Sequence, residues 1–409
     1  MRKVPFVAES LCCIAVLLAA PSLRADALHD WNTQAGETVL AARMSAPLAT
    51  RTAALVQTAA YEAVNAITCQ YDGGANLQAP VDASIDAAIA AAHRAVLSQL
   101  VPAQQPAIDS AYQTALELIA DGSAKTDGIA VGEAAATSVL AARSGDGADA
   151  VESYRPYTAP GVYVPTTLPV LPQWPQREPW AMSHAKQFRP APPPALSSAR
   201  WMDDFNESKD FGGRSSTKRD AEQTDTAHFW ETTGPVIYFQ VVRSVTESSE
   251  RDVTRNARLL ALAAQAMDDA LIAVFDAKYA YNFWRPISAI RNGDLDGNQA
   301  TARDPSWLPL IDTPMHPEYP CAHCTVAAAI GAVLEADVGP QPSPTLHASS
   351  PTLPGVLRSW SNMADFVAEV ANARVWAGVH YRNSTEVGAT LGRNVGLAVA
   401  KSHGFRSVD

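Results

Sequence analysis

The chain is organised around the stretch Lys278-Tyr-Ala-Tyr-Asn-Phe-Trp-Arg285-Pro286, which combines two cations with a run of aromatic residues. Lys278 and Arg285 are seven residues apart, about two turns of an α-helix, so on one continuous helix both cations would emerge from nearly the same face. Two like charges on one stripe repel each other unless an anion lies between them. The stretch therefore predicts a helix that contributes to an anion-binding site.

Two further segments add chemistry to this stretch. The first, His316-Pro-Glu-Tyr-Pro-Cys-Ala-His323, precedes a helical pattern over residues 325–336. We therefore expect His323 in the first turn of a helix, where unpaired backbone amides favour an anion. The second, Arg374-Val-Trp-Ala-Gly-Val-His380, adds another fixed cation and an imidazole. Together the three segments predict an oxyanion site built from three cations and two histidines.

Residues 1–27 are typical of an export signal. Arg2 and Lys3 precede an apolar core over residues 11–20, and residues 25–27 offer a small-x-small cleavage site. The core is too short to span a bilayer as a mature helix, and no later apolar run reaches the required length of about 18 residues. We expect an exported protein, periplasmic or extracellular, with no transmembrane span in the mature chain; an uncleaved N-terminal anchor is the alternative.

The net charge and the cysteines narrow the function further. A net charge of −11 argues against a nucleic-acid partner, whose phosphates need a basic face. Beyond the signal, Cys69, Cys321 and Cys324 remain, so at least one thiol has no partner within the chain. The Cys-x-x-Cys spacing of the last two is typical of redox motifs, and the nearby His316 makes zinc an alternative, although one thiolate pair falls short of the four ligands of structural zinc. The sequence leaves open whether they form a disulfide.

Helical periodicity covers most of the chain and predicts an all-α fold, either one large helical bundle or two fused bundles. The pattern over residues 251–289 is the longest and predicts an apolar stripe on one side of its helix, which Pro286 should kink or end. A helix should also begin near residue 197. The other expected helices span residues 37–67, 83–101, 105–120, 123–143, 217–231, 235–248, 325–336, 356–379 and 385–402.

A proline-rich segment, residues 145–198, separates an N-terminal helical region, residues 28–144, from a C-terminal helical region, residues 199–409, that carries the oxyanion site. Its prolines forbid a continuous helix. Aromatic residues between the prolines suggest that the segment is packed against the helices rather than free. We interpret it as a wrapping arm that shapes the mouth of the site; a domain linker is the alternative.

The three site segments, in this order and at this spacing, resemble the signature of the superfamily of type 2 phosphatidic acid phosphatases and vanadium haloperoxidases: Lys-x6-Arg-Pro, Pro-Ser-Gly-His and Ser-Arg-x5-His. Upstream, residues 187–190, 192–195 and 219–230 resemble the haloperoxidase branch rather than the short membrane phosphatases. The length and helical character of the chain agree with that branch.

The resemblance implies a vanadate cofactor. Its equatorial oxygens would be neutralised by Lys278, Arg285 and Arg374. Cys321 stands where the superfamily usually has serine, and Ala322 stands where it has the glycine whose amide donates to an oxygen.

The two histidines take different roles in this resemblance. His380 would bind vanadium through a ring nitrogen, and His323 would be the acid–base group. With hydrogen peroxide, such an enzyme oxidises halide, and the product halogenates an organic acceptor. His316 matches a second histidine of some bromide-oxidising relatives, which weakly favours bromide, and Trp284 could wall a halide pocket; either residue could instead serve packing.

Three departures from the signature stand out. Cys321 replaces a hydroxyl with a weaker donor that is open to oxidation, and a disulfide would remove the donor outright. Ala373 replaces the serine before Arg374. Ser384 occupies the position, four residues after His380, where many relatives have an aspartate that orients the histidine, so Ser384 would hold the imidazole less firmly.

Two other functions fit the same residues. In a secreted acid phosphatase, phosphate would take the place of vanadate, His380 would form a phosphohistidine with a phosphate ester, and His323 would protonate the leaving group. Alternatively, the altered positions could mark a non-catalytic anion-binding protein. The resemblance also implies a homodimer, although no isolated apolar stripe in the sequence demands one. Halide preference and organic substrate do not follow from the sequence.

Overall fold

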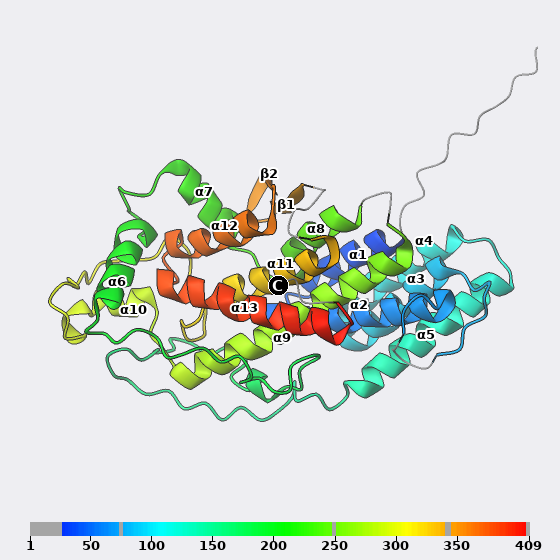
Figure 1. Cartoon of the computed structure of the whole chain (residues 1–409), viewed down its shortest axis with the longest axis horizontal. Helices are drawn as coiled ribbons and strands as arrows, with labels where there is room; N and C mark the ends of the chain where they lie inside the picture. The colour runs from blue at the N-terminus through cyan, green and yellow to red at the C-terminus, as the bar shows by residue number, and fades with distance from the viewer. Residues whose placement is uncertain (1–26, 73–76, 248–250, 340–344, 406–409) are drawn as a thin grey trace, which may run out of the picture.

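The computed structural model describes residues 27–72, 77–247, 251–339 and 345–405 of the 409-residue chain. This part of the chain contains thirteen α-helices and one two-stranded sheet, so the all-α fold predicted from the sequence is confirmed. The molecule is elongated, with helices from the first third of the chain at one end (Figure 1). The segment interpreted as an export signal lies outside the described residues except for Ala27. Within the described ranges, no helix is long and apolar enough to cross a membrane.

The N-terminal helices form the bundle at that end: α1 (Ala27–Ala41), α2 (Ala46–Thr68), α3 (Ile85–Leu100), α4 (Gln105–Glu117) and α5 (Ser123–Ala142). Alanine dominates the core between α2, α3 and α5, so these helices pack closely. The pattern over residues 37–67 forms two helices rather than the single one expected. The chain turns at residues 42–45, and Pro47 then lies in the first turn of α2, where its missing N–H costs nothing.

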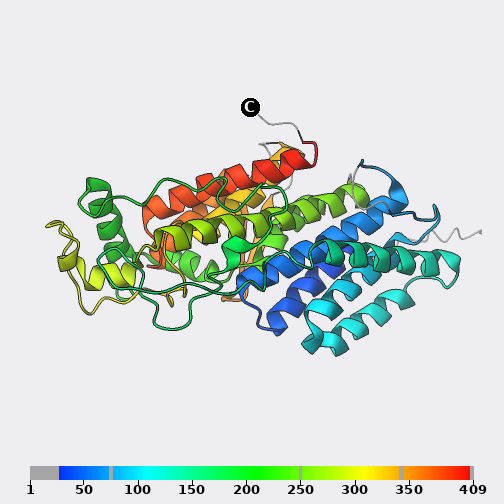
Figure 2. The ribbon, with the colours of Figure 1, turned by 90° about the horizontal axis from the view of Figure 1, so that it is seen from below.

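The longest helix, α9 (Val253–Tyr281), is the centre of the fold. It packs against α2 of the first bundle and against α11 (Ala322–Val338) and α13 (Arg382–Ser402) of the second (Figure 2). Nearly every residue of α9 up to Lys278 is buried, including Asp268 and Asp269. The expected apolar stripe is buried, and the burial extends around most of the helix to include Asp268 and Asp269, which have hydrogen-bond partners.

The prediction that Lys278 and Arg285 share one helix is also wrong. Asn282 adopts a left-handed conformation (φ 48°) and caps α9, so the chain leaves the helix before Arg285. Arg285 is instead the N-cap residue of a separate short helix, α10 (Pro286–Arg291), and Pro286 occupies its first position. Two segments, rather than one helical face, position the two cations.

The remaining helices of the second half are α6 (Ala199–Gly212), α7 (Ala221–Phe229), α8 (Pro235–Thr246) and α12 (Met363–Trp376). A hairpin of β1 (Leu346–Ser350) and β2 (Leu353–Trp360), paired antiparallel, packs against α8. The helix expected over residues 356–379 is therefore wrong at its start. Residues 357–360 pair with β1 instead, and α12 begins only after Asn362, whose side chain accepts the amide of Asp365.

Glycines set the distance between α11 and α13. A Cβ atom added at Gly388, Gly392 or Gly396 of α13 would lie 2.7, 2.0 or 2.3 Å from a backbone carbonyl oxygen of α11. Real Cβ atoms do not approach other atoms so closely, so only glycine permits this contact. The spacing of four residues keeps all three on one face of α13.

Residues 145–198 have little regular structure and run along the lower side of the molecule in Figure 1. Carboxylates of α9 hold this arm. Asp269 accepts the backbone amides of Trp180 and Ala181 at 2.7 and 2.9 Å, and Asp268 accepts from Arg177 at 2.5 Å. Further along, Asp276 binds the guanidinium of Arg189. The buried acids of the central helix thus anchor the arm.

Candidate oxyanion site

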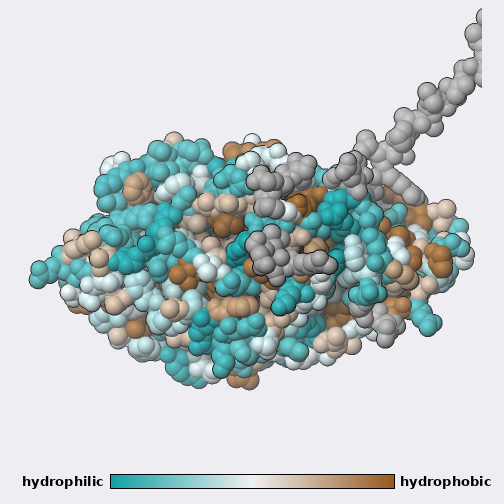
Figure 3. All heavy atoms as spheres, in the orientation of Figure 1, coloured by the Kyte–Doolittle hydropathy of each residue, from teal (hydrophilic) through white to brown (hydrophobic). Residues whose placement is uncertain are grey.

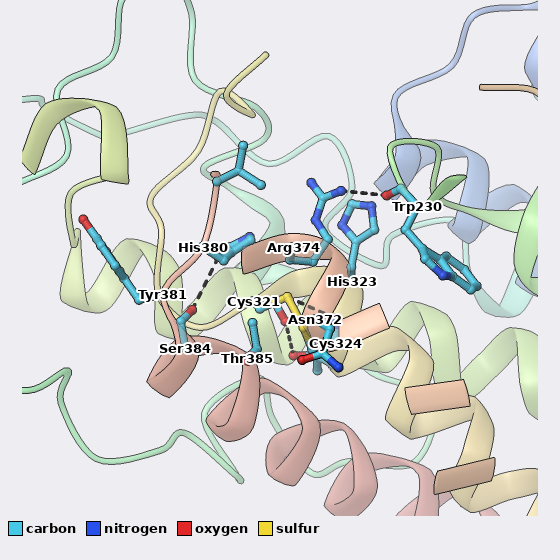
Figure 4. Close-up of a disulfide and its surroundings, with 12 residues drawn as sticks. Trp230, Cys321, His323, Cys324, Asn372, Arg374, His380, Tyr381, Ser384 and Thr385 are labelled. Carbon is cyan, nitrogen blue, oxygen red and sulfur yellow. Dashed lines mark hydrogen bonds between the residues drawn. A yellow bond between two sulfur atoms is a disulfide. The ribbon is translucent and has the colours of Figure 1, made fainter. Parts of the chain in front are cut away.

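Five of the residues singled out in the sequence converge at the second bundle, although they come from different elements. They are Lys278 at the end of α9, Arg285 at the start of α10, His323 in the first turn of α11, Arg374 near the end of α12, and His380 between α12 and α13. None is more than 8% exposed. Several of them stand close together in Figure 4.

Lys278 is fully buried and donates to two backbone carbonyls of the loop before α11, at 2.9 Å from Pro317 O and 2.8 Å from Glu318 O. Burial lowers the pKa of this ammonium well below its usual range, and the charge of Arg285 lowers it further. The lysine therefore fixes the loop that leads to His323 and at the same time brings a cation into the site.

Arg285 uses its whole guanidinium. Nη1 donates to Val379 O at 2.7 Å and faces Nε2 of His380 at 3.2 Å, while Nε donates to His316 O at 3.0 Å. Nη2 lies 3.0 Å from Nδ1 of His316, a nitrogen that also lies 3.1 Å from Pro317 O. Burial lowers the pKa of Arg285 to about 10, which leaves it charged at neutral pH. This one side chain links the loop, α10 and His380.

Arg374 has fewer partners. Nη1 donates to Trp230 O at 2.6 Å, and its Nε is buried without a hydrogen-bond partner (Figure 4). Burial lowers the pKa of Arg374 to about 10. A buried guanidinium with an unused N–H is costly unless an acceptor approaches it.

His323 lies beside Arg374 in Figure 4. Its Nε2 is buried and has no hydrogen-bond partner, whereas the hydroxyl of Tyr238 donates to its backbone carbonyl at 3.3 Å. Burial and the neighbouring cations lower the pKa of His323 well below its usual range. The imidazole is therefore neutral at neutral pH, with one ring nitrogen free for chemistry.

Glu318 is the functional residue that sequence reasoning missed. Its Oε1 lies 2.7 Å from Nδ1 of His380 and accepts the amide of Tyr381 at 3.1 Å. Burial raises the pKa of this carboxyl to about 7, against the opposing effect of Lys278 and Arg285. Ser384, expected to orient the histidine, is more distant, with Oγ 3.4 Å from the same nitrogen. In the sequence, the one signal for Glu318 is its position between His316 and His323.

Cys321 and Cys324 form a disulfide. Cys321 is the N-cap of α11, and its sulfur accepts the amide of Cys324 at 3.2 Å. With its sulfur bonded, Cys321 has no side-chain donor to offer an oxyanion, so its expected role as a serine substitute is lost. Zinc also finds no support, because the described residues contain no group of three His, Cys, Asp or Glu side chains suited to a metal ion. Cys69 is free and exposed.

A hollow of about 360 Å³ reaches the site. The hollow is lined by four residues of the site segments: His316, Ala322, His323 and Arg374. Most of its other walls are apolar and include Leu271, Phe275, Ile311 and Val326. Two carboxylates, those of Glu231 and Asp312, also line it. Trp284 does not line it. The ring of Trp284 instead stacks on Trp201 at a centroid distance of 5.8 Å within a separate aromatic cluster.

The charges decide what this site can hold. Three basic side chains, Lys278, Arg285 and Arg374, are buried around one buried carboxyl group, that of Glu318. Buried charges need partners, and the unused N–H of Arg374 and the free Nε2 of His323 need hydrogen-bond partners too. A small oxyanion such as vanadate or phosphate meets both needs, so the residues present fit the cofactor implied by the resemblance.

Comparison with known proteins agrees with the fold. Residues 258–405 match the model of the VCPO second helical-bundle domain, a range that contains all five convergent residues. The match covers 148 of the 409 residues, and over this second bundle the chain is similar to the vanadium haloperoxidases, as the sequence had suggested.

Individual haloperoxidases show how far the likeness extends. The vanadium chloroperoxidase of Curvularia inaequalis is 32% identical over 174 residues, which cover 34% of this chain and only 28% of that protein. A bacterial vanadium-dependent iodoperoxidase shares the fold with a TM-score of 0.80 at 24% identity, covering 94% of this chain and 98% of its own. An apo-type bacterial vanadium-dependent chloroperoxidase has a TM-score of 0.70 at 18% identity, covering 88% and 93%.

Proposed function

We propose that this protein is a vanadium-dependent haloperoxidase that holds vanadate at His380 and uses hydrogen peroxide to oxidise halide. One observation carries the proposal: Nε2 of His380 points at the guanidinium of Arg285, 3.2 Å away, within a cluster of three buried cations. A protonated guanidinium only donates, so Nε2 keeps its lone pair and can act as a ligand.

The other residues of the site then take separate roles. Lys278, Arg285 and Arg374 neutralise the oxygens of the anion, and their buried, hydrogen-bonded positions require little rearrangement when it binds. Vanadate held in this way supplies a Lewis acid that activates hydrogen peroxide for oxygen transfer to halide. The amide of Ala322, in the first turn of α11, would add a backbone donor to the anion.

His323 is the proton acceptor in this proposal. Its imidazole is neutral and its Nε2 has no partner within the protein, so this nitrogen can accept a proton from hydrogen peroxide. Its position on the wall of the hollow gives small molecules a path to that nitrogen.

We propose bromide as the halide and an organic molecule as its acceptor. His316, which lines the hollow and binds Arg285 through Nδ1, supports the halide assignment, since it places a second imidazole beside the anion site. The apolar walls of the hollow suit an organic acceptor, such as a phenol.

The test is a paired assay on purified protein reconstituted with orthovanadate in phosphate-free buffer. Iodide, bromide and chloride are each offered with hydrogen peroxide, and halogenation of a phenolic dye is measured. We expect vanadate-dependent bromination that His380→Ala abolishes and that His347→Ala, a histidine of the exposed hairpin, leaves intact. Activity without added vanadate in metal-free protein, or full activity of His380→Ala, would refute the proposal.

The acid phosphatase remains the second candidate because the same cations and the same Nε2 suit phosphate. There, Nε2 of His380 would attack phosphorus and the alcohol would leave with a proton from His323. Hydrolysis of p-nitrophenyl phosphate, inhibited by vanadate and unaccompanied by bromination, would establish this candidate in place of the first. Binding of either anion without turnover would point to the non-catalytic alternative.

A further inference from the structure

The histidine proposed to bind the anion is held from behind by a carboxylate that the superfamily signature does not contain. Oε1 of Glu318 lies 2.7 Å from Nδ1 of His380, and both side chains are at most 2% exposed. The two residues are 62 positions apart in the chain, and the glutamate belongs to the loop before α11 rather than to the segment of the histidine.

The hydrogen bonds around this pair identify the protonated nitrogen. The same Oε1 also accepts the backbone amide of Tyr381 at 3.1 Å, so it acts as an acceptor. As a carboxylate Glu318 can only accept, and Nδ1 then carries the proton that it donates to Glu318. On the other side of the ring, the guanidinium of Arg285 faces Nε2 at 3.2 Å and can only donate. Both neighbours thus specify the tautomer with the proton on Nδ1 and the lone pair on Nε2.

The glutamate is itself held firmly. Its backbone carbonyl accepts from Nζ of Lys278 at 2.8 Å, and its backbone amide donates to Phe283 O at 2.9 Å. Glu318 is fully buried, so water does not compete for its side chain. One cation of the site therefore also fixes the backbone from which the carboxylate reaches His380.

Ser384 stands at the position where many relatives are expected to carry the orienting aspartate. Its hydroxyl lies 3.4 Å from Nδ1, a longer contact than that of Glu318 (Figure 4). A serine at this position does not deprive His380 of a carboxylate partner, because one arrives from another part of the chain.

We propose that Glu318 is the positioning residue of the site: it fixes the ring orientation and the Nδ1–H tautomer of His380. Its value for turnover rests on the proposed function, whereas its effect on the tautomer does not. Partners of this kind, behind a histidine ligand, typically change metal affinity or activity by about 10–100-fold.

The first test needs no activity. The protein is labelled with ¹⁵N-histidine, the His380 signals are assigned by their loss in His380→Gln, and the tautomer is determined from the nitrogen shifts. We expect Nδ1 protonated and Nε2 unprotonated in the unmodified chain. A proton on Nε2 of the neutral ring would overturn the proposal, whatever reaction the protein catalyses.

The second test measures the dissociation constants of orthovanadate and of phosphate by calorimetry. We expect Glu318→Gln to weaken both anions by about 10–100-fold, and Ser384→Ala to weaken them less. Glu335→Gln, a glutamate on the outer side of α11 that pairs with Arg393, is the matched control and should leave both constants unchanged.

A relocated carboxylate separates positioning from general structure. In Glu318→Gln/Ser384→Asp, the acid returns four residues after His380, at the N-terminal turn of α13, where a carboxylate is also favourable. We expect this double variant to recover at least a tenth of the original affinity and the Nδ1–H tautomer. Unchanged affinity and tautomer in Glu318→Gln, with an unaltered melting temperature, would refute the proposal, and so would failure of the folded double variant to recover either property.

Discussion

Nη1 of Arg285 and Nε2 of His380 face each other at 3.2 Å, with the carbonyl of Val379 as a second acceptor for the same Nη1. In the anion-free protein, Arg285 thus contacts the lone pair on Nε2 of His380 that the proposed cofactor would use. Binding of the anion would replace this contact of Nε2 with the guanidinium by one with the anion. The pair keeps the imidazole in its binding orientation before the anion arrives.

Replacing Arg285 with lysine should therefore remove several hydrogen bonds of this side chain at once. Lysine keeps the positive charge but cannot reach Val379 O, His316 and His380 together, since it lacks the planar fork. We expect vanadate binding to weaken by about 2–5 kcal/mol, measured by calorimetry. Arg291→Lys, on the exposed end of α10, is the control, and equal affinities of the two variants would contradict this account.

Arg374→Met should separate stability from anion binding. The guanidinium is buried among other cations, has one hydrogen bond to Trp230 O and leaves Nε unused, so an apolar side chain of similar length should raise the melting temperature of the anion-free protein. The unmodified chain should gain about 2.7 kcal/mol at a vanadate concentration of 100 Kd. In the variant this gain should vanish; a persistent vanadate-induced shift would exclude Arg374 from the site.

His93 should make the N-terminal bundle sensitive to acid. It is fully buried, its Nδ1 lies 2.9 Å from Ile89 O, and its Nε2 lies 3.3 Å from the side-chain nitrogen of Gln57. Burial lowers its pKa from 6.5 to about 4. The unfolded chain therefore binds the proton first, and stability present above pH 6.5 is lost as the pH falls towards 4.

The loss attributable to His93 should reach about 3 kcal/mol, from 1.36 kcal/mol for each pKa unit. Urea unfolding at pH 7 and pH 4.5 measures it. The loss between these pH values should be smaller in His93→Gln than in the unmodified chain, whereas His347→Gln, at the exposed hairpin, should show the full loss. Identical losses in all three proteins would show that His93 does not carry this dependence.

The arm should depend on Asp269. Its carboxylate accepts the amides of Trp180 and Ala181, and replacing it with alanine leaves these donors without partners. We expect Asp269→Ala to reduce the free energy of unfolding by about 2–4 kcal/mol and to speed proteolysis within residues 145–198. Asp276→Ala, which removes a more exposed ion pair with Arg189, should cost less. A larger loss from Asp276→Ala would locate the main anchor there.

Local sequence patterns predicted most helices but not where the chain leaves them. Periodicity extends through Asn282 without interruption, because the left-handed conformation that ends α9 depends on tertiary contacts, among them the pairing of Phe283 with Val162 of the arm. The hairpin at residues 346–360 was missed although Pro354 and Gly355 disfavour a helix. In both cases contacts between distant segments determine the local conformation.

The site was predictable where spacing carried information. Lys278, Arg285, His323, Arg374 and His380 meet as expected, because a signature read over about 110 residues outweighs the solvent-exposed location usual for each cation alone. The role of Glu318 could not be predicted in this way. Glu318 lies in a loop, and the partner of its carboxylate depends on the path of that loop, which the sequence spacing does not reveal. Trp284, placed beside a cation by the sequence, points into a different cluster for the same reason.

The glycine contacts between α11 and α13 have a consequence for ligand choice. His323 belongs to α11, and His380 lies just before the start of α13. The backbones of these two helices are in contact where Gly392 meets Thr325 O. The two helices therefore cannot move closer together to contact a smaller anion. Vanadate has longer bonds to oxygen than phosphate, so a site of fixed width would contact the two anions unequally, and the glycine contacts would then act as a size filter.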